Sequence, residues 1–199
     1  MGLWCAMAAP VLYFGAQLVA APFYPGYSFV SQSASMLGSD LAKHPWILNT
    51  GAILTGVACL VGSVGYVRGL KRVGGVAVFA WLTAVCLVLS GVGSIKAGIY
   101  PLPDPRHGSW GFLGIAMILM PVFLLLAAWR LPARGLKIYL GASILLIAVM
   151  FPVMTRMIDV DRSKYDGLIQ RVFAAAVFPP IGVGAWWLKR KAVMGQLRG

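Results

Sequence analysis

Long runs without a charged side chain dominate this sequence and restrict the folds open to it. The first charged residue is Asp40. Further uncharged stretches cover 45–67, 73–95, 108–129, 138–155 and 172–188. A helix needs roughly 20 apolar residues to cross the hydrocarbon core of a bilayer. Charged residues make up only 11% of the chain, whereas a soluble domain has roughly 25%. The pattern predicts an all-α, polytopic membrane protein.

We expect a six-transmembrane-helix bundle formed by residues 1–199 as a single integral membrane domain. The expected spans are about 2–22, 46–67, 73–100, 105–129, 138–158 and 167–188. The first one lacks the basic segment and cleavage region of a signal peptide, so we interpret it as a span. Pro121, Pro152 and the pair Pro179–Pro180 lie inside expected helices. Each proline removes a backbone donor and should kink its helix.

Two connections carry signals for helix ends. In the long first connection, 23–45, the apolar residues of 28–37 recur at helical intervals, with Ser28 as a candidate cap and Gly38 as a candidate end. This pattern fits a short interfacial helix and fits a re-entrant lid equally well. Asp104 followed by Pro105 predicts the start of the fourth helix, because Asp caps helices and Pro favours the first helical position.

The cations are divided unevenly between the two sides of the expected bundle. One side carries ten cations and no acidic residue: Arg68, Lys71, Arg72, Arg130, Arg134, Lys137, Lys189, Arg190, Lys191 and Arg198. The other side carries the remaining cations and all five Asp. The positive-inside rule makes the first side cytoplasmic. We therefore expect a multi-pass protein of the inner (plasma) membrane with both termini in the cytoplasm.

The net charge of +12 fits basic anchors on anionic lipid, so membrane lipids are the expected partners. Nucleic acid is not, because no basic stripe carries interleaved aromatic residues. The cysteines Cys5, Cys59 and Cys86 all lie inside apolar runs. They show neither a disulfide framework nor metal-ligand spacing. We expect no cofactor and no metal site.

Four segments of the chain resemble a family of small prokaryotic membrane proteins. The most specific is 25–38, Pro-Gly-Tyr-Ser-Phe-Val-Ser-Gln-Ser-Ala-Ser-Met-Leu-Gly. The others are 49–56, 98–104 and 167–171. The family is catalogued as domain of unknown function nine-nine-eight. The resemblance covers nearly the whole chain and implies six helices with a polar outer face, without implying a reaction.

Three cations stand near the outer ends of expected spans, namely Lys96, Arg156 and Arg171. An unpaired charge inside the bilayer is costly and usually faces the bundle interior or a wet cavity. Our hypothesis is that the three, with Tyr27 and Ser33 of the first connection, line an outer-leaflet pocket for an anionic lipid head group or a small anion. The alternative is three separate side chains that reach out to the interface.

Asp104 and His107 are three residues apart and form a candidate acid–base pair at the membrane surface. The alternative makes Asp104 a helix cap and His107 an ordinary interfacial residue. Ser31, Ser33 and Ser35 are candidate nucleophiles by residue type alone, since no Gly-x-Ser-x-Gly motif surrounds them. The favoured alternative makes them the polar face of a short helix.

Three functions follow from these observations. The favoured one is a membrane protein that binds an anionic head group or small anion. The first alternative is a membrane-embedded enzyme that acts on lipid-linked substrates through an Asp/His pair. The second is a structural or assembly partner without a ligand. The identity of the ligand and the oligomeric state stay open at this point.

Overall fold

The computed structural model describes residues 1–108 and 111–196, with side chains up to residue 192. Its helices are α1 (Gly2–Ala20), η1 (Ala21–Phe23), η2 (Ala34–Gly38), α2 (Trp46–Arg72), α3 (Ala77–Ile99), α4 (Gly111–Ala127), α5 (Arg134–Met154), α6 (Arg162–Val177) and α7 (Pro179–Gln196). These described residues contain no strand. Residues 109–110 of the expected fourth span and the counted cation Arg198 lie outside them.

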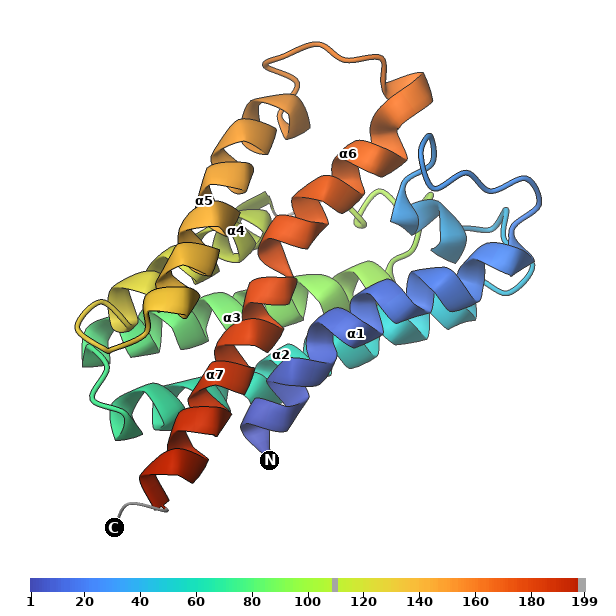
Figure 1. Ribbon diagram of the computed structural model, residues 1–199. Helices are drawn as coiled ribbons and strands as arrows, with labels where there is room; N and C mark the ends of the chain where they lie inside the picture. The colour runs from blue at the N-terminus through green and yellow to red at the C-terminus, as the bar shows by residue number, and fades with distance from the viewer. Residues whose placement is uncertain (109–110, 197–199) are drawn as a thin grey trace.

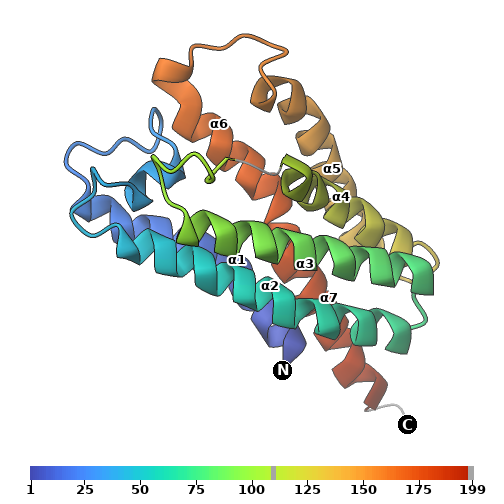
Figure 2. The ribbon, with the colours of Figure 1, turned by 180° about the vertical axis from the view of Figure 1, so that it is seen from behind.

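The helices from α1 to α6 run up and down through the bundle with consecutive ones side by side, and α7 continues α6 end to end (Figures 1 and 2). α2 packs along both α1 and α3, and α4 and α5 continue the series from α3 to α6. α7 returns against α1 and α2, so the two termini lie at the same end of the bundle. Short connections favour this arrangement, because they join antiparallel neighbours.

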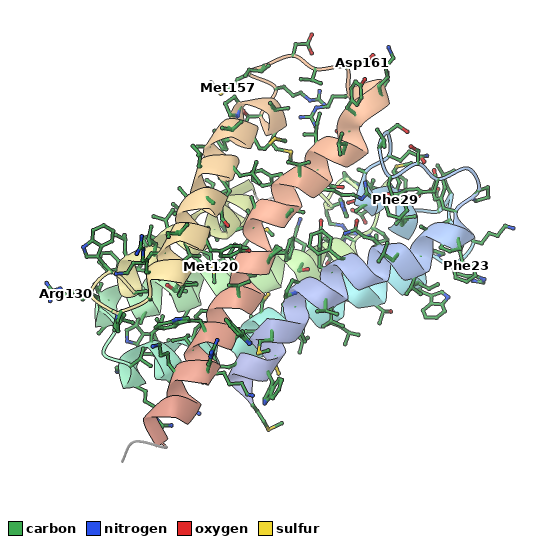
Figure 3. The ribbon with its side chains drawn as sticks, viewed as in Figure 1. Phe23, Phe29, Met120, Arg130, Met157 and Asp161 are labelled. Carbon is green, nitrogen blue, oxygen red and sulfur yellow. The ribbon has the colours of Figure 1, made fainter. Side chains whose placement is uncertain are left out.

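The bundle has two chemically different ends. We call one the loop end; it consists of residues 21–45, 100–108 and 155–161. We call the other the basic end; it consists of residues 73–76, 128–133, the adjoining helix ends and α7 from Lys189 onward. Figure 3 shows Arg130 at the basic end, and Asp161 and Phe29 at the loop end. All five Asp residues lie in or next to the loops of the loop end.

The helices have the length and surface of membrane spans. Five segments are long and apolar enough to cross a bilayer: Gly2–Phe23, Trp46–Arg72, Ala77–Ile99, Arg134–Met154 and Arg162–Ala192. α4 is a shorter apolar helix. Large apolar side chains in the middle of helices face outward, such as Val64, 50% exposed, and Leu145, 66% exposed. The protein is therefore a polytopic membrane helical bundle, and the predicted fold class is confirmed.

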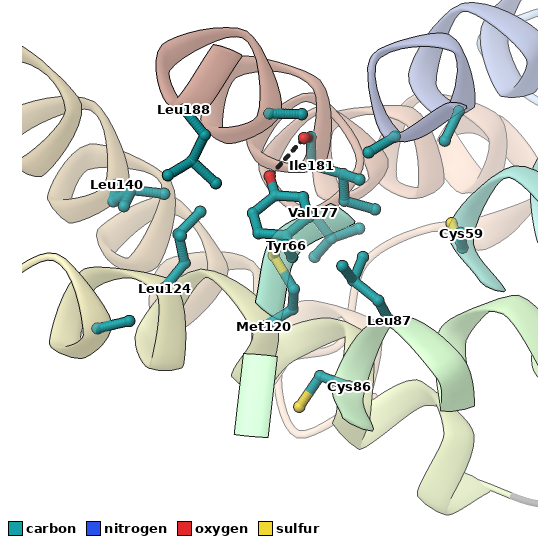
Figure 4. Close-up of a cluster of buried hydrophobic side chains, with 14 of the residues drawn as sticks. Cys59, Tyr66, Cys86, Leu87, Met120, Leu124, Leu140, Val177, Ile181 and Leu188 are labelled. Carbon is teal, nitrogen blue, oxygen red and sulfur yellow. Dashed lines mark hydrogen bonds between the residues drawn. The ribbon is translucent and has the colours of Figure 1, made fainter. Parts of the chain in front are cut away.

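The last span is broken into α6 and α7 at Phe178, directly before Pro179 and Pro180. Prolines at these positions cannot donate to the preceding turn, so the break has the predicted cause. Next to it, the fully buried Tyr66 donates its hydroxyl to the carbonyl oxygen of Ile181 at 2.5 Å (Figure 4). A buried phenol therefore finds an acceptor in the first turn of α7.

The start of the fourth helix differs from the prediction. In the described residues α4 begins at Gly111, and 101–108 form turns, so the prediction that Asp104 caps this helix is wrong. The Asp104 carboxylate makes the hydrogen bond of a capping residue to a single turn, but Lys96 binds the carbonyl that a helix would need to continue. The Asp104 carboxylate accepts from the backbone N–H of Arg106 at 2.8 Å, and the Lys96 ammonium donates to the Arg106 carbonyl.

The segment 28–37 is also not one short helix. Ser28 does cap a single turn, because its hydroxyl accepts from the backbone N–H of Ser31 at 3.3 Å. The turn does not continue, and a separate 3-10 helix, η2, follows. The backbone N–H of Leu168 in α6 donates to the Val30 carbonyl at 2.8 Å. The loop is therefore fastened to α6 through a carbonyl that a continuing helix would have used.

Glycines allow α2 and α3 to touch through their backbones. A Cβ atom on Gly56 would lie 2.4 Å from the Gly91 carbonyl oxygen, and one on Gly91 would lie 2.7 Å from the Gly56 carbonyl oxygen. In the membrane no hydrophobic effect drives helices together. Small residues allow such close contact, and the resulting van der Waals packing associates the helices.

We expect Gly56→Ala to lower the free energy of unfolding. Overpacking costs ~1–3 kcal/mol, which outweighs the gain in helix propensity of up to ~1 kcal/mol. The control is Gly114→Ala on α4, where an added Cβ meets no atom within 4 Å. Thermal midpoints of both variants in the same detergent measure the difference. Equal stability of the two variants would contradict the close approach of α2 and α3.

Candidate functional site

A small polar cavity lies at the loop end, bounded by η2, the 100–108 loop and the nearby ends of α1, α2, α3 and α6. Its volume is about 80 Å³. The polar side chains that line it are Tyr13, Gln17, Ser35, Asn49, Ser94, His107 and Gln170. One water needs at least about 10–15 Å³. The cavity therefore holds a few waters or one small group, such as a carboxylate or an ester carbonyl, and is too small for a whole lipid head group.

Side chains from two helices hold η2 at the cavity. The Gln170 Oε1 atom on α6 accepts from the backbone N–H of Ala34 at 2.6 Å. The Asn49 Nδ2 atom on α2 donates to the Gly38 carbonyl at 3.0 Å. Both ends of η2 are thus fixed to the bundle, and Ser35 lies between the two attachment points.

His107 connects the 100–108 loop to η2. Its Nδ1 atom lies 2.7 Å from the carbonyl oxygen of Tyr100, and its Nε2 atom lies 2.9 Å from the hydroxyl oxygen of Ser35. A carbonyl oxygen only accepts, so Nδ1 carries the proton in this contact. In the neutral imidazole Nε2 is then the acceptor, and the Ser35 hydroxyl donates to it.

The Asp104 carboxylate is bound to Arg106 and not to His107. Its Oδ1 accepts from Arg106 Nε at 2.9 Å, and its Oδ2 accepts from Arg106 Nη2 at 2.6 Å. These hydrogen bonds lower the pKa of the Asp104 carboxyl to about 2. His107 meets Asp104 only through the backbone, where its N–H donates to the Asp104 carbonyl at 2.9 Å. The structure therefore does not bring the two side chains of the expected acid–base pair together.

Lys96 is a buried cation near the cavity, with 8% of the residue exposed. Its ammonium donates to the Arg106 carbonyl and thereby holds the 100–108 loop. The next residue, Ala97, lines the cavity.

Arg171 holds the first loop, residues 21–45, by hydrogen bonds to its main-chain carbonyls. Its Nη1 atom donates to the carbonyls of Phe29 at 2.8 Å and Gln32 at 3.0 Å. Its carbon Cζ lies 4.7 Å from the centre of the Phe29 ring. Gln170, the residue before it, lines the cavity. Lys96 and Arg171 thus adjoin the cavity through neighbouring residues, and each binds main-chain oxygens of a loop.

Tyr27 and Ser33 take part in the hydrogen bonds between Arg171 and the first loop. The Tyr27 hydroxyl accepts from Arg171 Nη2 at 2.5 Å and donates to the Ser33 carbonyl at 2.9 Å. Burial raises the pKa of Tyr27, and the hydrogen bond from Arg171 opposes that shift. Ser33 contributes its carbonyl oxygen to this network.

Arg156 lies apart from these residues. It is exposed in the turn after α5, where its backbone has a φ of 62°. The adjacent Met157 lies at the end of α5, where its backbone N–H donates to the Pro152 carbonyl at 2.8 Å, and Figure 3 shows it well separated from Phe29 of the first loop. The structure thus brings Tyr27, Ser33 and Arg171 together, with Lys96 at the second loop and Arg156 outside.

The contact between Ser35 and His107 is the feature that sequence reasoning missed. The two residues are 72 positions apart, so no local spacing links them. The sequence offers Ser31, Ser33 and Ser35 as candidates, and no feature of it distinguishes Ser35 from the other two. The segments that carry the family resemblance held a usable signal, because Gly38, Asn49 and Gln170 all belong to them and all position η2.

Comparison with known proteins places the chain in a family. No curated protein and no solved structure matches it. In the described residues, no group of three or more His, Cys, Asp or Glu is arranged to hold a metal ion. A family described as "Protein of unknown function (DUF998)" matches residues 7–187, from α1 to the middle of α7. The chain therefore belongs to the DUF998 family, and the resemblance seen in the sequence is confirmed.

Proposed function

We propose that the protein is a membrane-embedded enzyme that cleaves ester bonds in lipids, with Ser35 as the nucleophile and His107 as the base. The observation that carries this proposal is the position of the His107 ring between the Tyr100 carbonyl and the Ser35 hydroxyl. Serine is activated for acyl transfer when its hydroxyl is hydrogen-bonded to a base and a third group orients that base.

The reaction uses only groups at the cavity. Ser35 Oγ attacks the carbonyl carbon of the ester, and its proton moves to His107 Nε2. The carbon–oxygen bond to the alcohol then breaks, and the alcohol leaves with that proton. Water attacks the acyl-serine, gives its proton to Nε2, and the acid departs as Ser35 regains the proton. The products are a carboxylic acid and an alcohol.

The surroundings of the cavity favour a lipid as the substrate. The cavity lies towards the loop end of the membrane-spanning helices, and in this proposal the ester groups of lipids reach it there. Its volume of about 80 Å³ fits the ester group itself. Lys96 and Arg171 beside the cavity supply positive charge, which stabilises a developing oxyanion and attracts lipids with anionic head groups.

Purified protein in detergent should react with a fluorophosphonate probe at Ser35. We expect Ser35→Ala to abolish the adduct. We expect His107→Gln to slow labelling by about 10²–10⁴-fold, the range for loss of a general base. Mass spectrometry of the peptide that contains residue 35 measures the adduct.

Ser33→Ala is the matched control, because Ser33 lies two residues away and uses its carbonyl rather than its hydroxyl. It should label at the wild-type rate. Thermal midpoints show that each variant is folded. A folded wild-type protein that forms no adduct at Ser35, or a Ser35→Ala variant that labels normally, would refute the proposal.

A second candidate function is binding of a small anion, or of the phosphate of an anionic head group, without chemistry. Arg171 favours it, because its hydrogen-bond partners in the described residues are neutral oxygens. The ion pairs of those residues are Asp104–Arg106, Asp166–Arg162 and Asp161–Lys164. The charge of Arg171 is therefore solvated by the loop but not neutralised.

Inorganic phosphate tests this second function, since it is small enough for the cavity. We expect phosphate to raise the thermal midpoint, because a ligand of the folded state stabilises it. Lys96→Gln and Arg171→Gln should each remove the phosphate-dependent rise, and the exposed Arg156→Gln should keep it. Loss of the rise in all three variants would support the three-cation pocket that the sequence suggested. A wild-type midpoint that phosphate does not change would exclude both pockets.

We infer that the basic end faces the cytoplasm and that the cavity opens on the outer side of the plasma membrane. The support is the charge distribution, since the basic end carries a large excess of Lys and Arg without an acidic side chain. Both termini are then cytoplasmic. The small residue Gly135, at the basic end, and the exposed Asp159, at the loop end, offer sites to test this orientation.

In a variant with Cys5, Cys59 and Cys86 replaced by Ala, Asp159→Cys should react with a membrane-impermeant maleimide in intact cells. Gly135→Cys should react only after the cells are opened. Position 135 accepts a side chain, because an added Cβ meets no atom within 4 Å. The reverse pattern of labelling would invert the orientation.

A further inference from the structure

A second cavity lies at the basic end, between the first turns of α5 and the lower half of α7. Its volume is about 500 Å³, within the roughly 300–1,000 Å³ of small-molecule sites. We call it the basic groove, and its lining includes Arg134, Tyr139, Trp186, Trp187, Arg190 and Lys191. It is at the opposite end of the bundle from the polar cavity, and no step proposed above uses it.

The mouth of the groove is strongly cationic. Arg134, Arg190 and Lys191 contribute three positive charges, and in the part of the chain that the structure describes none of them has an ion-pair partner. All five acidic residues of the chain lie at the loop end. Arg190 lies 5.5 Å from the centre of the Trp186 ring, and Lys191 lies 5.7 Å from that of Trp187. The cations are thus held at the groove by aromatic rings, which leaves their charge available to an anion.

The mouth of the groove is charged, whereas its walls are apolar. Leu136 and Tyr139 on α5 face Val183 on α7 across it. The groove also lies at the end of membrane spans, where Trp side chains mark the interface. A soluble anion would match the mouth but not the walls. A phospholipid matches both, with its phosphate at the cations and the upper part of an acyl chain between the helices.

We propose that the basic groove binds one anionic phospholipid. The phosphate lies against Arg134, Arg190 and Lys191, where the arginine fork suits two phosphate oxygens. Basic pockets between membrane helices select anionic head groups in this manner. The assignment does not depend on the esterase proposed for the other end.

The test uses the full chain purified in a nonionic detergent, with phosphatidylglycerol and phosphatidylcholine of identical acyl chains as probes. We expect native mass spectrometry to show one bound phosphatidylglycerol and the thermal midpoint to rise with its concentration. Phosphatidylcholine should do neither. Arg134→Gln and Arg190→Gln should each weaken binding about fivefold, which corresponds to about 1 kcal/mol for a basic residue at a membrane surface.

Three further variants separate the groove from the general charge of the protein. Arg72→Gln removes one cation of the basic end that does not line the groove, so it should leave the affinity unchanged. Gly135→Phe keeps every charge but fills the groove from α5, where an added Cβ has open space, so it should abolish binding. Arg156→Gln, which removes an exposed cation of the loop end outside the candidate site, should bind normally.

Four results would each overturn the proposal. Equal binding of phosphatidylcholine would remove the selectivity for an anion. An equal loss of affinity in Arg72→Gln and Arg190→Gln would assign the effect to diffuse surface charge. Equal stabilisation by soluble glycerol phosphate, or full binding by folded Gly135→Phe, would show that no acyl chain enters the groove.

Discussion

The hydrogen bonds from the Arg171 guanidinium to the first loop are the interaction on which the candidate site depends. They hold the carbonyls of Phe29 and Gln32 and the hydroxyl of Tyr27. That loop leads directly into η2, which carries Ser35 to the cavity. Backbone polar groups near the membrane need partners inside the protein. A guanidinium offers five donors in a fixed plane, so one side chain organises a loop without regular structure.

The same solution recurs around the loop end. Lys96 binds the Arg106 carbonyl, His107 faces the Tyr100 carbonyl, and Arg162 donates to the Val153 carbonyl at 2.6 Å. Lys96 and Arg162 each take a carbonyl from another segment of the chain, and His107 takes one within its own loop. These contacts fix the position of segments that have no regular secondary structure. They also give the cations of the loop end a structural role.

The spans were predictable because apolar runs of bilayer length alternate with charged segments. A transmembrane helix is the structure that accommodates an uncharged run such as 73–95. The errors came where a local signal competed with a distant partner. Asp104–Pro105 is a good helix start in isolation, and Asp104 does accept from the Arg106 N–H, yet Lys96 binds the Arg106 carbonyl that a continuing helix would need. The candidate site lay mostly beyond prediction, because the contact of Ser35 with His107 arises from the packing of separate segments. Sequence spacing carries no record of such a contact.

The separation of charge between the two ends has a consequence for the lifetime of the molecule in the membrane. Moving a charged side chain through the bilayer centre costs ~2.5–3.5 kcal/mol on insertion scales. The basic end of the described chain carries Arg68, Lys71, Arg72, Arg130, Arg134, Lys137, Lys189, Arg190 and Lys191. To carry all of them across would cost on the order of 20 kcal/mol or more, so the protein does not invert after insertion. The polar cavity therefore meets the lipids of a single leaflet throughout its life, and any lipid of the opposite leaflet reaches it only after another process has moved that lipid across.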